Sequence, residues 1–392
     1  MTTNNRPIPS RIRVRPGPGA PPSVDGHPGW VNAENNSWSW PALTTVFCLC
    51  LLTGTGPLLQ SARSASWWIS LLGTALGALL TWLPLWGVMR ARGEALTLDE
   101  AYARAFGGPV GGFLSLLAAA AFLLNAAQTL RILAAFVRLY MIDGARGLVV
   151  SLAALSALAL MLCRRHARGF SRGAWGLRFV LCGLMAVSAL MMTRNADAFN
   201  LFPLLGESPR ATLAALPAAL SNGMGVASLA ALPRLTGSAK PPRFRLGLAA
   251  GLLGALAGGV FVLLACLSVP LRSADAAASG GIGLMLAIEY LSSAQIFRVL
   301  YQFALLLLLL ISTGASLTGC GALLAGVWRA RRMRGGLACA CLLAAVISAC
   351  PDAPFYQALE NTQLLRAAVL ALPAWAAWPI LKNREKQNHA AR

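Results

Sequence analysis

The sequence predicts an all-α protein that crosses a membrane about ten times. Hydrophobic residues make up 57% of the chain and charged residues only 12%, and the mean hydropathy is +0.63. This composition is typical of a polytopic membrane protein and not of a soluble domain. The net charge of +20 is carried by short basic clusters between apolar runs, which is how membrane topology is encoded and not how nucleic acid is bound.

The N-terminal segment, residues 1–38, is predicted to be a disordered tail. It is rich in Pro, Gly, Asn and Arg and has no apolar periodicity. It does not resemble a cleaved signal, because the first long apolar run continues into a full span. Its arginines are expected either to be solvated or to contact anionic membrane lipid. Residues 39–382 form the membrane domain, and residues 383–392 a basic tail.

Ten apolar runs define the predicted spans. A membrane crossing takes roughly 20 residues, and most of the runs reach that length. The ninth run is the shortest. The spans lie near residues 40–59, 67–89, 109–140, 146–163, 174–193, 211–232, 246–270, 296–327, 336–350 and 364–381.

Basic residues test this division independently of hydropathy. With ten spans, 24 of the 33 lysines and arginines fall in the tails and loops of one side. The loops of the other side carry acids such as Asp143, Asp197 and Glu207. Cytoplasmic loops retain positive charge, so both termini are predicted to be cytoplasmic and the number of spans to be even.

Two spans carry a glycine-centred break at matching places. The first span contains Thr53-Gly54-Thr55-Gly56-Pro57, and the sixth contains Ser221-Asn222-Gly223-Met224-Gly225. Unwound backbone is tolerated at membrane depth only where it is buried in protein or lines a cavity. Matched breaks indicate an inverted repeat, about 40–193 and 211–381, with a small ligand held near the midplane. The alternative is that Gly and Pro are simply common in membrane helices.

A few polar residues inside other spans extend this candidate site. Asn125, Gln128 and Arg131 recur every third residue on span three, which predicts that they share one helical face. Arg131 would pair with a ligand carboxylate or a backbone carbonyl, or would extend toward the interface. On span eight, Ser312 and Thr313 either contact the ligand or support close helix packing.

Helix polarity suggests a ligand class. A half-helix starting near Gly56 would expose N–H groups suited to a carboxylate. Carbonyls freed at Gly223 to Gly225 would suit an ammonium group or a cation. An amino acid has both groups.

Other classes of function lack their motifs. The chain has no nucleophile-elbow, zinc-protease or phosphate-loop motif, so it is predicted not to be an enzyme. The nine cysteines lie mostly in apolar runs and the three histidines in tails or a loop, so no metal or cofactor is expected. No carboxylate sits at the centre of a span, which disfavours a proton-driven carrier.

Four stretches together resemble a known family, the B subunit of spore nutrient-germinant receptors. This family is a branch of the amino acid/polyamine/organocation transporter superfamily. The likeness runs from about residue 40 to 381. The stretches are Gly54 to Leu59 with Ala65 to Ser70, Leu96 to Tyr102 with Phe106 to Gly111, Leu130-Arg131, and Asn200 to Glu207.

The resemblance implies a transporter fold with helices 1 and 6 broken, used as a sensor. Such a subunit lies in the spore inner membrane with an A-type membrane subunit and a C-type lipoprotein, and binds an amino acid or similar germinant. Secondary transport of an amino acid or organic cation is the alternative, and a scaffold without ligand a weaker one. The Asn200 to Glu207 element is expected to be either a simple turn or part of an outer gate or docking surface.

Overall fold

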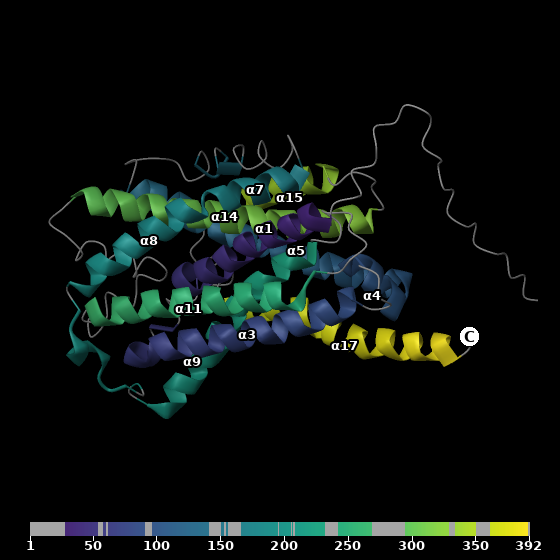
Figure 1. The fold of residues 1–392 in the computed structure, drawn as a ribbon, viewed down its shortest axis with the longest axis horizontal. Helices are drawn as coiled ribbons and strands as arrows, with labels where there is room; N and C mark the ends of the chain where they lie inside the picture. The colour runs from purple at the N-terminus through teal and green to yellow at the C-terminus, as the bar shows by residue number, and fades with distance from the viewer. Residues whose placement is uncertain are drawn as a thin grey trace, which may run out of the picture.

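A computed structural model shows a bundle of helices (Figure 1). It describes residues 28–53, 58–59, 62–90, 96–140, 150–152, 154–155, 166–194, 196–204, 206, 208–231, 242–268, 295–328, 334–349 and 361–390. Within these ranges no β-strand occurs.

The α-helices run mostly along the long axis of the molecule (Figure 1). They are α1 (Pro28–Cys48), α3 (Ser66–Met89), α4 (Leu98–Phe106), α5 (Gly108–Tyr140), α7 (His166–Gly176), α8 (Arg178–Thr193), α9 (Pro209–Asn222), α11 (Phe244–Ser268), α14 (Gln295–Val327), α15 (Arg334–Ala349) and α17 (Gln363–Ala390). Tighter or wider helical segments are the π-helix η2 (Leu49–Thr53) and the 3-10 helices η3 (Arg63–Ala65), η5 (Ala198–Leu201) and η6 (Gly223–Ala231).

The helices confirm a multi-pass membrane protein. Among the described residues, six helices are long and apolar enough to cross a membrane. Phe170–Gly176 and Arg178–Thr193 meet the same criteria as a pair; they are bent by 44° at their junction and make a seventh crossing if the pair is one span. Two predicted spans correspond to shorter apolar helices, Trp38–Leu52 and Ala338–Ser348. The predicted span at 146–163 falls largely outside the described residues, and the count of ten remains a prediction.

The first and last helices of the chain, α1 and α17, extend beyond the apolar runs predicted from the sequence. Helix α1 begins at Pro28, inside the predicted tail, where proline is tolerated because the first N–H of a helix has no partner. Helix α17 continues to Ala390, through the predicted basic tail. Its last two turns are rich in Lys, Glu, Gln and Arg, which are good helix formers. Near this end Arg384 donates to the carbonyl of Arg104 on α4.

Glycines let α11 approach two neighbours closely. Gly247, Gly251, Gly254 and Gly258 share one face of α11 and lie against Trp82, Ala78, Val46 and Cys50. The opposite face presents Leu252, Leu253 and Leu256, each about half exposed. Lipid is as apolar as leucine, so small residues that allow close contact favour helix association in a membrane.

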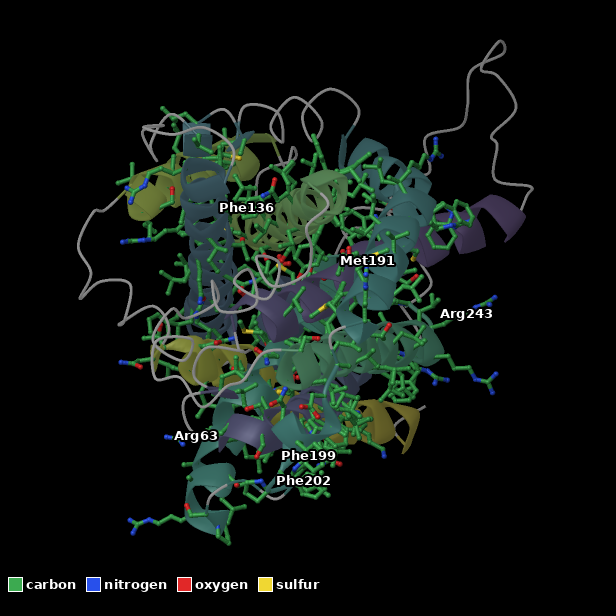
Figure 2. All side chains as sticks on the ribbon, turned by 90° about the vertical axis from the view of Figure 1, so that its left-hand side faces the viewer. Arg63, Phe136, Met191, Phe199, Phe202 and Arg243 are labelled. Carbon is green, nitrogen blue, oxygen red and sulfur yellow. The ribbon has the colours of Figure 1, made fainter. Side chains whose placement is uncertain are left out.

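The Asn200 to Gly206 element is a turn held against the bundle. Gly206 has a φ of 80°, a conformation that favours glycine. The Asn200 amide donates to the Leu267 carbonyl at 2.8 Å, and the Ser64 hydroxyl to the Pro203 carbonyl at 2.6 Å. Phe199 and Phe202 lie together at this end of the molecule (Figure 2) and are 80% and 57% exposed. The turn interpretation fits these contacts; residues 205 and 207 are outside the described part.

Candidate functional site

A small cavity, the central cavity, lies in the interior of the bundle. Five elements surround it: α1, α5, η6, α14 and α17. The lining residues are Thr45, Ala121, Phe122, Asn125, Met224, Gly225, Ser228, Ser316 and Leu370. Three of these, Asn125, Met224 and Gly225, are among the residues predicted from the sequence.

Close helix crossings beside the cavity depend on the glycines of the second predicted break. A Cβ atom at Gly225 would lie 2.7 Å from the backbone nitrogen of Val46 on α1. A Cβ atom at Gly223 would lie 2.0 Å from the backbone nitrogen of Ala78 on α3. Residues 221–225 are not unwound: α9 ends at Asn222 and continues directly as the 3-10 helix η6. This change of helix type occurs where the sequence predicts a break.

The first predicted break can be located only in part. The helix that carries it widens into the π-helix Leu49–Thr53. The π-helix is rare in proteins overall, but it occurs frequently at functional sites. Gly54, Thr55, Gly56 and Pro57, and the side chain of Thr53, lie outside the described residues. Their role at the site therefore stays a prediction.

One buried acceptor in the cavity lacks a hydrogen bond. The Asn125 side-chain nitrogen donates to the Ser316 hydroxyl at 2.8 Å, across 191 residues of sequence. Its oxygen, Oδ1, is buried and has no partner. The Ser228 and Thr45 hydroxyls donate to carbonyls of their own helices, Gly225 at 2.9 Å and Pro41 at 2.7 Å. A ligand that donates hydrogen bonds would satisfy Asn125.

A second group of buried polar residues lies one helical turn away from the cavity. Gln128 follows Asn125 on α5, Asn222 precedes Gly225, and Arg366 precedes Leu370 on α17. The Arg366 guanidinium donates to Gln128 Oε1 at 2.5 Å. Gln363, three residues before Arg366, donates to Asn222 Oδ1 at 2.9 Å. We call Gln128, Asn222, Gln363 and Arg366 the amide–guanidinium layer; each of the four is at most 3% exposed.

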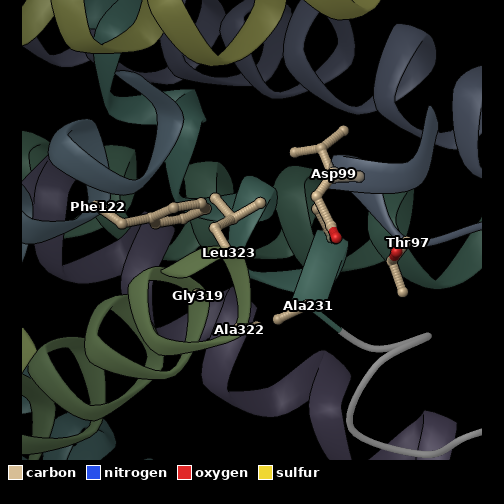
Figure 3. A pocket seen from close by; sticks show the side chains of 9 residues that line it. Thr97, Asp99, Phe122, Ala231, Gly319, Ala322 and Leu323 are labelled. Carbon is tan, nitrogen blue, oxygen red and sulfur yellow. The ribbon is translucent and has the colours of Figure 1, made fainter. Parts of the chain in front are cut away.

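Phe122 separates the central cavity from another one on its opposite side. The second cavity is also small, and it is lined by Thr97, Leu98, Asp99, Phe122, Ala230, Ala231, Gly319, Ala322 and Leu323. Figure 3 shows the Phe122 ring beside Leu323, with Asp99 and Thr97 across the space. Gly319 lies under the ring, since a Cβ atom there would be 3.1 Å from two ring carbons. The two cavities thus follow one another along the bundle.

A family model described as spore germination protein matches residues 43–241. The match covers half of the chain. This chain belongs to the spore germination protein family. The matched region includes α5 and η6, which supply Phe122, Asn125 and Gly225 to the site. The match confirms the resemblance of the sequence to germinant-receptor subunits. No curated protein is detectably similar to the chain.

The predicted residues of this spore germination protein divide into two groups. The structure places Asn125, Gln128, Asn222, Met224 and Gly225 at the cavity or the layer beside it. Thr313 is buried in the same region and shares a 2.9 Å hydrogen bond with Thr129 of α5. Ser312 is also buried, and the Ser221 hydroxyl donates to the Ala218 carbonyl of its own helix.

Arg131 belongs to the second group, because it is half-buried and does not line the cavity. The reason is geometric: positions three apart on an α-helix rotate by about 60° away from a common face at each step. Asn125 and Gln128 therefore face the core, whereas Arg131 has turned to its margin.

Among the described residues, the arginine buried beside the cavity is Arg366, which is not among the site residues predicted from the sequence. Its signal is a basic residue three positions inside an apolar run predicted to span the membrane, and such residues usually face the bundle interior. Gln363 lies just before that run, and Ser316, Thr45 and Ser228 are hydroxyl residues within apolar stretches. The sequence alone does not distinguish these hydroxyls from buried hydroxyls that lie away from the cavity.

Proposed function

We propose that this protein is the membrane subunit of a spore nutrient-germinant receptor and binds a small germinant in the central cavity. The observation that carries the proposal is the small cavity beside the predicted break, where Asn125 Oδ1 is buried without a partner. Family membership supports a role in germination. The cavity is small in this structure, so a germinant would bind a more open state of the bundle.

The proposal retains the finer expectations from the sequence. The chain would form ten spans in an inverted repeat, with the Gly54 to Pro57 backbone completing the site. It would lie in the spore inner membrane with both termini on the core side, together with an A-type membrane subunit and a C-type lipoprotein. It would have no enzymatic activity of its own.

Signalling would follow from a shift between two states of the bundle. A ligand shifts such an equilibrium only by as much as it prefers one state, and a complete switch takes about 5.5 kcal/mol. Phe122 is placed to report this shift, because its ring contacts both the ligand cavity and the cavity that contains Asp99. The partner subunits would then detect the rearrangement.

Spores carrying Asn125→Ala test the proposal. Removing the amide takes away the free acceptor and the bond to Ser316, so the nutrient response should be lost while the protein still accumulates in the membrane. Thr318→Ala is a matched control on α14, because the Thr318 hydroxyl is also buried but bonds only to the Gly314 carbonyl of its own helix. A normal response in the Asn125 variant would contradict the assignment of the cavity.

Transport is the second candidate, favoured by the two cavities in line. Only Phe122 is shared by both linings, as expected of a path closed at one point. Counterflow of labelled amino acids into proteoliposomes containing the isolated chain separates the two functions. Substrate exchange would establish transport, and binding without exchange would support sensing.

A further inference from the structure

The amide–guanidinium layer, one helical turn from the central cavity, contains buried hydrogen-bond donors without an acceptor. A guanidinium can only donate, so Gln128 must turn its oxygen toward Arg366 and its nitrogen, Nε2, away. That nitrogen is buried and has no hydrogen-bond partner. Asn222 is arranged in the same way: its oxygen accepts from Gln363, and its nitrogen, Nδ2, is buried without a partner.

These groups cannot satisfy one another. The two amide N–H₂ groups can bond neither to each other nor to the guanidinium, because all three are donors, and a buried amide donor without an acceptor is unfavourable. Arg366 and Gln363 are three residues apart on α17, so their side chains project from neighbouring positions of the helix. Gln128 and Asn222 are each bonded to one of them and are therefore held in the same layer.

We propose that Arg366, Gln128 and Asn222 form a carboxylate-binding subsite at the end of the central cavity. A carboxylate has two oxygens with about four acceptor positions, enough for the free donors of both amides and an additional bond from the guanidinium. Hydrogen bonds of this kind are charge-assisted and short, and arginine is especially suited to a planar carboxylate.

The neighbouring layer has the complementary polarity. Asn125, one turn along α5 from Gln128, offers the free acceptor Oδ1 inside the cavity. A ligand with a carboxylate at one end and a hydrogen-bond donor at the other would satisfy all three unpartnered amide groups. This inference rests on the proposed function, since it names the chemistry of the ligand that the same cavity would take.

Matched acids and amides test the subsite directly. Full-length protein in nanodiscs is titrated with the twenty amino acids and with their α-carboxamides, which differ only by replacing the carboxylate with an amide, and binding is read from thermal stability. At least one amino acid should bind, and its carboxamide should bind at least about 10-fold more weakly.

Arg366→Gln should weaken binding of that acid by about 10- to 100-fold. Arg138→Gln, an exposed arginine on α5, is the control and should leave binding unchanged.

Gln128→Glu guards against a variant that merely fails to fold. The new carboxylate would lie beside Arg366 and occupy the subsite from within, so the protein should be at least as stable as the wild type. It should nevertheless lose its preference for the acid over the carboxamide. Retention of that preference in Gln128→Glu or in a folded Arg366→Gln protein would overturn the proposal.

The outcomes also separate this inference from the proposed function. Equal binding of acids and carboxamides, abolished by Asn125→Ala, would overturn the carboxylate subsite and leave a germinant-binding cavity. Absence of any binding from the acid panel would overturn the subsite. If, in addition, spores with Asn125→Ala respond normally, both the carboxylate subsite and the proposed function are overturned.

Discussion

Gly223 shows how one residue serves both a local conformation and a helix crossing. It begins the 3-10 helix η6, and it also allows the backbones of η6 and α3 to touch at Gly77 and Ala78. If Gly223 served only to interrupt the α-helix, a larger residue could replace it. Here the neighbouring atoms are backbone atoms, which cannot move aside as a side chain can.

We therefore expect Gly223→Ala to destabilise the protein. A Cβ atom placed 2.0 Å from a backbone nitrogen forces the two helices apart, and overpacking of this kind costs about 1–3 kcal/mol. Gly112→Ala on α5 is the control: its Cβ would meet nothing within 4 Å, so it should be neutral or stabilise the helix by up to about 1 kcal/mol. Thermal unfolding in detergent measures both. Equal stability of the two variants would mean that α3 and η6 are not packed as described.

Tyr102 on α4 gives a pH-dependent prediction. Its side chain is fully buried, its hydroxyl has no hydrogen-bond partner, and burial raises the pKa of Tyr102 above its usual value. The unfolded chain ionises near pH 10, whereas the folded protein resists ionisation, so this residue's contribution to stability is complete below pH 10 and is lost above it.

Tyr102→Phe should accordingly be neutral or slightly stabilising at pH 7, because no hydrogen bond is lost. Above pH 10 the variant should lose less stability than the wild type. Unfolding curves at pH 7 and at pH 10.5 to 11 provide the comparison. Parallel loss of stability in both proteins would show that the hydroxyl reaches water.

At the scale of elements, α11 fixes the position of α1 beside the cavity. Gly254 lies against Val46, and a Cβ atom there would be 2.8 Å from the Val46 Cβ and 2.9 Å from the Leu43 carbonyl oxygen. Thr45, which lines the cavity, is the residue next to Val46. Displacing α1 from α11 would therefore displace one wall of the candidate site.

Gly254→Leu should lower both stability and ligand binding. The expected cost is about 1–3 kcal/mol from overpacking against α1. Leu253→Ala, at a position that is 53% exposed on the opposite face, should change stability by no more than about 0.5 kcal/mol. Thermal unfolding and binding are compared in the same detergent. A stable Gly254→Leu protein with unchanged binding would contradict this account of the α1–α11 contact.

The elements also show what the sequence can and cannot predict. Apolar length predicted the long helices correctly, because a span must cover the hydrocarbon without help from tertiary contacts. Asn125 was found because a polar residue is costly inside a membrane. Its partner Ser316 was not found, because it is 191 residues away in the sequence and the sequence alone does not show which helices pack together.

Arg366 illustrates a different limit. Its charge within an apolar run is visible in the sequence, but the regular spacing of Asn125, Gln128 and Arg131 drew attention to a different arginine. Only the packing of α17 against α5 shows that Gln128 pairs with Arg366. The glycine face of α11 has a readable period of three and four residues, yet its partners α1 and α3 follow from the fold alone.

At the scale of the whole molecule, the site crosses the boundary of the family match. Phe122, Asn125, Asn222 and Gly225 lie within residues 43–241, whereas α14 and α17 contribute Ser316, Arg366 and Leu370 from beyond it. The matched half supplies the crossing of η6 with α1 and α3, and the other half closes the cavity and brings the buried charge. A change of ligand between relatives could therefore arise from α14 and α17 without altering the matched part.

The number of membrane crossings can be tested through the positions of the two termini. With the bent pair counted as one span, the described residues give seven candidate crossings, an odd number, whereas the basic residues predict termini on one side. An even total needs one or three further crossings, and three candidates exist: Trp38–Leu52, Ala338–Ser348 and the predicted span at 146–163. The first is part of a helical stretch that runs from Pro28 to Thr53 and is long enough to reach across the bilayer.

Reporters fused at both ends and after Pro242 and Ala196 decide between these totals. Ten crossings place the two termini and Pro242 on the cytoplasmic side and Ala196 on the opposite side, so a cytoplasmic reporter should be active at the first three positions only. The paired control is an alkaline phosphatase reporter, which should be active only at Ala196. Termini on opposite sides would mean an odd number of crossings, and the two halves could not then be an inverted repeat of five helices each.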